Sequence, residues 1–381
     1  RIASRAEFAE KLDQLVQEED LRRLGKKNRA WVERDFSWEK ISRNLGTLLT
    51  TLADEGPTGQ VEKGTGLLRI AHITTAGQKC GIGEYTLNLI DNLPKSRVAS
   101  LICTCETPDG FNSLNELSRN HDAILGWFHD NVQYSSTRIR SDLVEIIAQW
   151  SADTALIQYH KAFFCERTLE VLCASLQSRG IKVAIVVHRL NELNLDLLHE
   201  LQKSGIQLIS HSQVEVDSAA PKGMDIEFVP IGVDKPAFAT MKTIRTRDWK
   251  ARPPTIVSTG FIRKHKGLVN LVRAIRVLQK DFPGASLRLQ CAEYPSDDSR
   301  EALTEVKQAI NECDLEQFVT LDTAFLPIEE VRSRIRRADI AVLPYDESDE
   351  GGSASAVTCF ETGLPLIVSK AQIFHEVRDY S

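Results

Sequence analysis

Short apolar runs, often β-branched, alternate with segments of helical period from Leu67 to the end of the chain. This alternation is typical of parallel sheets that are wrapped by helices. Most of the runs are apolar throughout rather than at every second residue, as expected for strands covered on both faces. The sequence therefore predicts an α/β fold. The predicted strands lie at 68–75, 98–104, 155–159, 182–188, 206–210, 226–229, 255–260, 286–291, 317–322, 338–344 and 365–369.

The predicted strands fall into two series. Between the series lies 234–254, a segment rich in charge and proline that has the composition of an inter-domain linker. Two doubly wound, Rossmann-like domains are therefore expected, at 67–235 and 250–381. Ligands bind such sheets at the carboxyl ends of the strands, so the loops that follow strands are where a site is expected.

Residues 1–55 do not show this alternation, because they carry helical patterns and no strand. One helix is expected to begin at Ser37, with an apolar stripe formed by Ile41, Leu45, Leu48 and Leu52. Such a helix needs a surface on which to pack. The segment 56–66 is polar and glycine-rich, which predicts a flexible linker before the first strand.

Charge and hydropathy exclude some partners. The chain has 53 acidic and 47 basic residues, a formal net charge of −6, which gives no bulk attraction to nucleic acid. No run approaches the roughly 20 apolar residues that span a bilayer. A soluble, cytoplasmic protein is expected. The basic stretch Arg22, Arg23, Lys26, Lys27 and Arg29 is either a solvated helix face or a contact with an acidic membrane surface.

The first candidate site is the glycine loop after the first strand, where Gly81 and Gly83 open the helix expected at 82–93. Glycines at such a junction let the backbone approach a phosphate, and the free N–H groups of the helix start favour its negative charge. The alternative is a tight turn between strand and helix that binds no ligand.

The second domain opens in the same way. Its first strand ends at Gly260, and a basic segment with Arg263 and Lys266 precedes the next helix. These cations at the carboxyl end of a strand are suited to neutralising a diphosphate. The alternative is a solvated basic loop.

A third candidate is the acidic, small-residue loop after the strand at 338–344. Ser353 and Ser355 can supply hydroxyl and N–H donors at a helix start, and Glu350 can accept hydrogen bonds from sugar hydroxyls. A solvated loop is the alternative. Asp346 and Asp349 could instead hold a divalent metal, but no further ligands are spaced to complete a shell, so no metal or other cofactor is predicted.

Two histidines, His160 and His188, each lie at the end of a predicted strand of the first domain. A histidine at the end of a strand is either part of a site or a hydrogen-bonded structural residue. No Ser–His–Asp arrangement, H-E-x-x-H zinc motif or P-loop occurs, so the sequence offers no covalent nucleophile or phosphate loop of a known kind.

Five segments in the right order resemble the group 1 retaining glycosyltransferases, nucleotide-sugar enzymes with the two-Rossmann GT-B fold. In turn, they are similar to the family's first glycine loop, its histidine-bearing strand, the turn before its linker, its donor-phosphate loop and its nucleotide loop. The segments are GIGEYTLNLIDNLP, VVHRLN, FVPIGVD, STGFIRKHKGLVNLVRAI and ADIAVLPY with GGSASAVTCFETGLPLIVS. The resemblance covers nearly all of 67–381.

The resemblance implies roles for individual residues. It assigns His188 to the reacting sugar, Gly81 and Gly83 to close approach of the donor diphosphate or acceptor, and Lys266 to neutralising the diphosphate. Two positions depart from the family pattern. Phe261 stands where the family has an arginine after the glycine, so Arg263 would have to substitute, and Thr358 stands where the family's second glutamate contacts the ribose.

The opening helices also resemble part of this family. The segment LGKKNRAWVERDFSWEKISRNLGTLL is similar to the family's C-terminal tail, which crosses back onto the first domain. Here it precedes that domain. Either the fold is circularly permuted, or the sequence is a segment of a longer chain of tandem glycosyltransferase units. The glycine-rich segment 56–66 favours the second alternative.

The resemblance implies a retaining, metal-independent hexosyltransferase of polysaccharide biosynthesis. Its donor would be a UDP- or GDP-linked sugar and its acceptor a glycan or a lipid-linked sugar, with peripheral contact to the inner face of the membrane as a further expectation. The departures at Phe261 and Thr358 support an alternative, an inactive sugar-nucleotide-binding unit that scaffolds a second glycosyltransferase in the same polypeptide.

Overall fold

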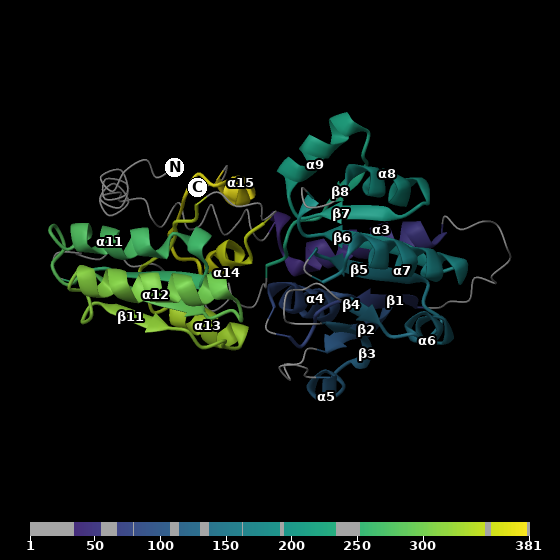
Figure 1. Ribbon diagram of the computed structural model, residues 1–381, viewed down its shortest axis with the longest axis horizontal. Helices are drawn as coiled ribbons and strands as arrows, with labels where there is room; N and C mark the ends of the chain where they lie inside the picture. Colours follow the sequence, from purple (N-terminus) through teal and green to yellow (C-terminus); the bar gives the residue numbers. More distant parts are fainter. Residues whose placement is uncertain are drawn as a thin grey trace. The chain divides into compact units, whose positions relative to one another are not determined.

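The computed structural model describes residues 34–54, 67–78, 80–106, 114–129, 137–161, 163–190, 194–233, 252–346 and 352–378 (Figure 1). The chain divides into two compact units. We call Trp38–Gly232 with Glu350–Gly352 the amino-terminal unit, and Arg1–Ser37, Val233–Asp349 and Ser353–Ser381 the carboxy-terminal unit. The two predicted linkers, 56–66 and most of 234–254, and the basic stretch 22–29 lie outside the described residues, so the domain limits predicted at 235 and 250 stay predictions.

The amino-terminal unit is built on an eight-stranded sheet of order β4-β3-β2-β1-β5-β6-β7-β8. All its neighbouring strands run parallel except β4, which is antiparallel to β3. The order reverses between β1 and β5. The strands are β1 (Leu68–Ile73), β2 (Val98–Glu106), β3 (Asp122–His129), β4 (Thr137–Ile139), β5 (Thr154–Tyr159), β6 (Lys182–Val187), β7 (Gln207–Ser210) and β8 (Ile226–Phe228).

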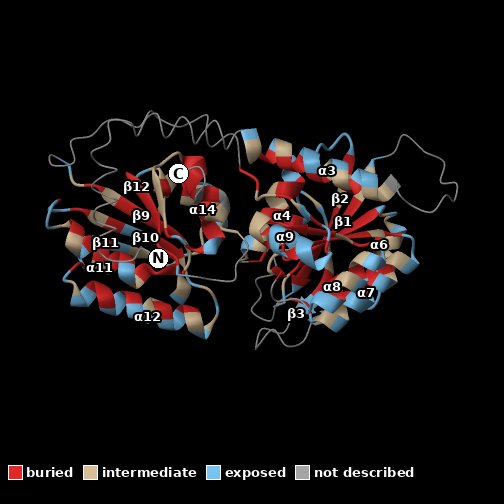
Figure 2. Ribbon diagram, turned by 90° about the horizontal axis from the view of Figure 1, so that it is seen from above, coloured by how far each residue is buried: buried red, intermediate tan, exposed pale blue. Residues whose placement is uncertain are grey.

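Helices cover both faces of this sheet. On one face α6, α7 and α8 pack on one set of strand residues, and on the other α3 and α4 pack on the alternate set (Figure 2). Every central strand is therefore buried on both sides, which explains its continuous apolar sequence. The helices are α3 (Trp38–Asp54), α4 (Gly81–Asn92), α5 (Leu114–Leu117), α6 (Leu143–Gln149), α7 (Glu166–Ser178), α8 (Leu195–Lys203), α9 (Gln213–Ala219) and the 3-10 turn η2 (Ala220–Lys222).

Helix α3 is the helix that the sequence predicted to begin at Ser37. Its residues Trp38, Ile41, Leu45 and Leu49 are buried against α4 and the sheet, whereas Leu48 and Leu52 are only partly buried. The buried stripe thus runs through Leu49 rather than Leu48. The indole of Trp38 lies so close to Gly232 that a Cβ there would clash with the ring. Close packing therefore fixes the start of α3.

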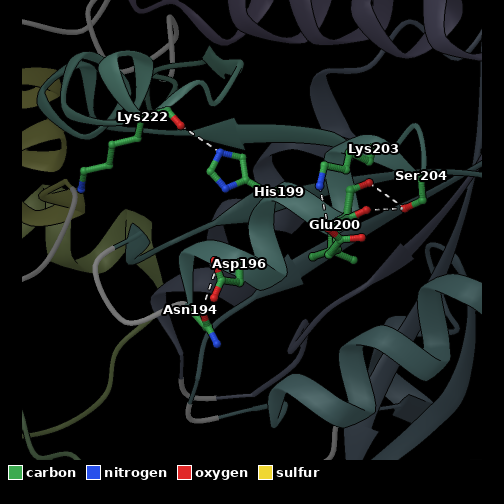
Figure 3. A network of polar contacts seen from close by, with 8 residues as sticks. Asn194, Asp196, His199, Glu200, Lys203, Ser204 and Lys222 are labelled. Atoms are coloured by element: carbon green, nitrogen blue, oxygen red, sulfur yellow. Dashed lines mark hydrogen bonds and ion pairs between the residues drawn. The ribbon is translucent and has the colours of Figure 1, made fainter.

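Helix α8 shows how local polar contacts hold an edge of this unit (Figure 3). The Asn194 side chain caps the helix start by accepting a hydrogen bond from the Asp196 N–H at 3.0 Å. At the other end the Ser204 hydroxyl donates back to the helix, at 2.7 Å from the Leu201 carbonyl. His199 Nε2 donates to the carbonyl of Lys222 at 2.8 Å. The last contact ties α8 to η2.

The carboxy-terminal unit contains a five-stranded parallel sheet of order β11-β10-β9-β12-β13. Its order reverses between β9 and β12. One face is covered by α11 and α12 and the other by α13 and α14. The elements are β9 (Thr255–Phe261), η3 (Lys264–Lys266), α11 (Leu268–Leu278), β10 (Ser286–Ala292), α12 (Asp297–Glu312), β11 (Val319–Asp322), α13 (Ile328–Ile335), β12 (Ile340–Leu343), α14 (Ala354–Thr362), β13 (Leu366–Val368), η4 (Gln372–Phe374) and α15 (His375–Arg378).

The predicted α/β class and the predicted strands are confirmed, each strand to within two residues at either end. The strands β3 and β4 were not predicted. The β3 sequence DAILGWFH is a short apolar run that a buried helix could equally contain, and β4 is only three residues long. Strand β4 is the outer strand of the sheet and β3 is its neighbour, and neither carries a predicted site residue.

Candidate functional site

In the carboxy-terminal unit, the loops after β9 and β12 meet where the strand order reverses. The Asp346 N–H donates to the His265 carbonyl at 2.8 Å, which joins the two loops. Two parallel strands whose connections leave in opposite directions open a crevice at their carboxyl ends, and ligands of doubly wound folds bind there. The predicted donor contacts that lie at this edge are Gly260, Arg263, Lys266, Ser353 and Ser355.

Lys266 is the cation that the fold holds most tightly at this edge. Its side chain is 9% exposed, and its Nζ lies 3.9 Å from the centroid of the Tyr345 ring, a cation–π contact. The next residue, Gly267, has φ +64°, and a Cβ there would clash with the carbonyl of Pro344. Only glycine fits this turn without strain, so the lysine is fixed at the start of α11.

The start of α14 lies beside the same loop. Ser353 caps this helix, its Oγ accepting a hydrogen bond from the Ala356 N–H at 3.2 Å. Gly260 has φ +125°, and a Cβ there would lie 2.6 Å from Ser355 Oγ. The end of β9 and the first turn of α14 therefore approach each other so closely that a side chain at Gly260 would disturb both. First-turn N–H groups have no partner within their own helix, so this junction is suited to an anion.

Arg263 and Phe261 lie at the same edge but are engaged with neighbours. The Arg263 guanidinium lies 4.5 Å from the centroid of the Tyr294 ring and 3.7 Å from an oxygen of Asp298. The Phe261 ring packs edge-on against Tyr294 at 5.3 Å and stacks on Phe325 at 5.9 Å. The position where the family has an arginine thus belongs to an aromatic cluster at the ends of β9, β10 and β11.

Thr358 and Glu350 are the two remaining residues that the sequence predicted in the loop and helix after β12. Thr358 lies on α14, and its hydroxyl donates to the Ala354 carbonyl at 2.9 Å, so part of its hydrogen-bonding capacity is used within the helix. Glu350 lies outside the described residues, as does Asp349.

In the amino-terminal unit, the two predicted glycines after β1 differ in the space around them. A Cβ at Gly83 would lie 2.5 Å from the Thr75 carbonyl oxygen, whereas a Cβ at Gly81 would meet nothing within 4 Å. Packing of α4 on the loop therefore requires glycine at Gly83 and leaves space around Gly81. The Gln78 side chain donates to the Cys105 carbonyl at 3.0 Å, which ties this loop to β2.

Three histidines follow three neighbouring strands of the same sheet: His160 after β5, His188 after β6 and His211 after β7. The rings of His188 and His211 are 5.3 Å apart. The buried ring of Tyr85, from α4, packs edge-on against both, at 6.1 Å and 4.6 Å. Tyr85 in turn contacts Trp38 of α3 at 5.5 Å. Aromatic contacts therefore connect α3 to the histidines.

Burial keeps the imidazoles of His188 and His211 neutral. Desolvation lowers the pKa of His211 from 6.5 to about 4. Desolvation also lowers the pKa of His188 well below its usual value, and the nearby His211 and His160 act in the same direction. His188 Nε2 donates to Gln158 Oε1 at 2.8 Å, and His211 Nδ1 donates to the Val229 carbonyl at 2.5 Å. Each ring therefore has one nitrogen that carries its proton and one that can accept a hydrogen bond.

No three His, Cys, Asp or Glu side chains in the described part of the chain are grouped so as to hold a metal ion. No helix among the described residues combines the length and the apolar character that a membrane span requires.

Solved structures with a similar backbone include HepE from Anabaena, determined with UDP and glucose: 16% identity, TM-score 0.55, 81% of this chain and 83% of that one. Sucrose-phosphate synthase from Thermosynechococcus elongatus has 17% identity, a TM-score of 0.57 and coverage of 81% and 82%. The α,α-trehalose-phosphate synthase from Burkholderia xenovorans, determined with glucose-6-phosphate, has 12% identity, a TM-score of 0.53 and coverage of 82% and 88%. The chain has the GT-B fold. No family model and no curated protein matches the sequence.

The site residues predicted for this GT-B chain are distributed over two sheet edges. Gly260, Arg263, Lys266, Ser353, Ser355 and Thr358 belong to the carboxy-terminal unit, and Gly81, Gly83 and His188 belong to the amino-terminal unit. Their contacts with a ligand stay predictions. The sequence prediction did not include His211 or Tyr85. The signal for His211 was the same as for His188, because it directly follows a predicted strand; Tyr85 lies in the glycine-loop segment already singled out.

Proposed function

We propose that this GT-B chain is a retaining glycosyltransferase that moves a hexose from a nucleotide-diphosphate donor to a glycan or lipid-linked acceptor. The observation that carries the proposal is the pairing of Lys266, buried on Tyr345, with the Ser353-capped start of α14 at the β9–β12 edge. A fixed cation and a helix start together suit a diphosphate. The donor we propose is a UDP- or GDP-sugar, and the structure of HepE with UDP and glucose supports UDP as the first candidate.

The proposed chemistry is stabilisation of a departing diphosphate. As the bond between the anomeric carbon and the diphosphate oxygen breaks, negative charge grows on the phosphate. Lys266 and the α14 start would stabilise that charge without reorganising. The acceptor hydroxyl oxygen forms the new bond on the face that the leaving group departs, and its proton passes to the diphosphate. No metal and no covalent enzyme nucleophile enters this scheme.

The neutral strand-end histidines are suited to sugar hydroxyls. A neutral imidazole that donates through one nitrogen keeps an acceptor on the other, and the rings of His188 and His211 are held in this form by burial. We assign the edge of the amino-terminal unit to the sugar-recognising half of the reaction, with His188 toward the reacting sugar. A role in polysaccharide biosynthesis, at the cytoplasmic face of a membrane and beside further glycosyltransferase units, completes the proposal.

The proposal is tested by incubating the purified chain with UDP- and GDP-sugars and measuring free nucleotide. A thermal-shift screen with the same sugars identifies the donor first, because a bound ligand raises stability with the logarithm of its concentration over its dissociation constant. We expect one nucleotide sugar to stabilise the chain and to be turned over slowly in water and faster with an acceptor. Absence of both stabilisation and turnover across the panel would refute the proposal.

The aromatic cluster around Phe261 favours a second candidate, a sugar-nucleotide-binding unit that scaffolds an active partner. Phe261 occupies the place of a cation, and Arg263 is held by Tyr294 and Asp298. This candidate predicts that UDP or GDP binds in calorimetry while no donor is consumed. Steady donor hydrolysis by the isolated chain would exclude it.

A further inference from the structure

Glu215, in α9, is a carboxylate that the fold buries at the histidine-bearing edge. Its side chain is 9% exposed. Burying a carboxylate costs free energy unless hydrogen bonds satisfy its oxygens. Both oxygens accept a hydrogen bond here. The two donors come from the ends of two different strands.

The first oxygen binds the segment that follows β6. The Leu190 N–H donates to Glu215 Oε1 at 3.0 Å. Leu190 lies two residues after His188, whose own N–H donates to the Tyr159 carbonyl at 3.2 Å and whose ring is bound to Gln158. The carboxylate therefore holds the end of a short segment whose other end is tied to β5.

The second oxygen binds Ser210, the last residue of β7. The Ser210 hydroxyl donates to Glu215 Oε2 at 2.7 Å and accepts from the Ser212 N–H at 3.1 Å. His211 lies between these two serines, and its ring is bound to the Val229 carbonyl. The Val229 N–H donates to the Ser210 carbonyl at 2.9 Å. The backbone around His211 is thus fixed on both sides.

We propose that Glu215 is a positioning residue, which spans two strand-end segments with one carboxylate and thereby fixes the His188 and His211 rings relative to each other. Each arm is a hydrogen bond to a different oxygen of the same carboxyl group. The consequence for catalysis rests on the proposed function. The consequence for the histidine rings does not, because it follows from these contacts alone.

The first test uses the ring signals of ¹³C-labelled histidine in NMR spectra of the full chain. In Glu215→Ala both arms are lost, and we expect the signals of His188 and His211 to move or broaden. Ser210→Ala removes only one arm and leaves the Leu190 contact. It is the milder change, and we expect it to move the His211 signals more than those of His188.

Asp153→Ala provides the matched control. Asp153 Oδ2 accepts from the Arg69 N–H at 2.7 Å, so this carboxylate also joins two neighbouring strands, at their amino ends rather than their carboxyl ends. We expect Asp153→Ala to leave the two histidine signals in place. If Ser210→Ala and Glu215→Ala move them no further than Asp153→Ala does, Glu215 has no positioning role.

The kinetic test asks for a change that loss of stability alone would not produce. Misplacing a contacting group by about 1 Å costs on the order of 10²-fold in rate. We expect Glu215→Ala to lower kcat by up to that factor and to leave the dissociation constant for the nucleotide unchanged, because the proposed nucleotide contacts belong to the other unit. Glu215→Gln keeps an oxygen for the Leu190 N–H and should recover most of kcat.

The outcomes separate the two proposals. A wild-type chain without turnover on any nucleotide sugar removes the proposed function but leaves the NMR comparison to decide whether Glu215 positions the histidines. Displaced histidine signals in Glu215→Ala with an unchanged kcat overturn the catalytic part. A nucleotide dissociation constant that rises in parallel with the loss of kcat, or a Glu215→Gln variant as impaired as Glu215→Ala, overturns it as well.

Discussion

The two sheet edges of this chain differ in the charge that the fold holds at each of them. At the edge of the carboxy-terminal unit, a buried lysine on an aromatic ring stands beside a capped helix start. At the edge of the amino-terminal unit, buried imidazoles are packed around Tyr85 and kept neutral. The first edge holds positive charge in place, and the second excludes it.

This difference matches what each half of a sugar transfer would need. A diphosphate is recognised by fixed cations and free N–H groups, whereas an uncharged hydroxyl is recognised by a donor and an acceptor of defined direction. The same Rossmann-like scaffold supports both, because only the residues after the strands differ. Changing those residues one at a time should therefore break one edge without altering the other.

Loss of Lys266 should have the largest effect. In Lys266→Ala the fixed cation disappears from the proposed phosphate site, and removing one such group typically costs about 10²- to 10³-fold in kcat, or about 3–4 kcal/mol. Donor turnover by the purified variant measures this. Lys264→Ala is the control, since Lys264 lies in the same loop as Lys266 but is exposed and is paired with Glu301 of α12 at 2.5 Å. Equal turnover in the two variants would show that the position of the cation is irrelevant.

The neutral edge should make the chain sensitive to acid. The pKa of His211 is lowered from 6.5 to about 4 in the folded chain. As the pH falls, the unfolded chain therefore binds a proton at His211 before the folded chain does. The contribution of His211 to the free energy of unfolding is complete above pH 6.5. It decreases by about 3 kcal/mol as the pH falls toward 4. Urea unfolding at pH 7 and pH 4.5 measures it, and His211→Gln should reduce the difference. A difference that is the same in wild type and variant would contradict the pKa shift.

The two glycines of the first loop allow a paired test of packing. Gly83→Ala places a Cβ 2.5 Å from the Thr75 carbonyl, so the backbone must move, at a cost of about 1–3 kcal/mol. Gly81→Ala meets open space and should be neutral or stabilising by up to about 1 kcal/mol. The free energy of unfolding measures both. Equal changes in the two variants would show that contact with Thr75 does not decide the choice of glycine.

The sequence predicted most of the architecture because hydrophobic period is a property of the chain alone. The runs at 182–188 and 206–210 could be placed as strands without any knowledge of their neighbours. Strands β3 and β4 could not be placed in this way. Their identity depends on pairing, β3 with β2 in parallel and β4 with β3 in antiparallel, and not on a pattern within each segment.

Part of the candidate site could also be predicted from patterns within the chain. Lys266 and Ser353 could be selected from their places after a strand and before a helix. The sequence does not show that Gly83 touches Thr75 while Gly81 touches nothing, because both glycines have the same local pattern. Nor could it show that Glu215 bridges two loops, since its partners lie 25 and 5 residues away and only the fold brings them together.

Phe261→Arg should have the smallest effect, and it sharpens the contrast between the edges. The variant adds a second cation at the end of β9 and removes a ring that contacts Tyr294 and Phe325. A half-exposed cation beside a phosphate contributes about 1 kcal/mol, so the nucleotide should bind about fivefold more tightly in calorimetry. Phe261→Leu, which removes the ring without adding charge, should bind as wild type does. If Phe261→Arg binds no better than Phe261→Leu, the aromatic cluster lies outside the reach of the diphosphate, and the positive edge is confined to Lys266 and the start of α14.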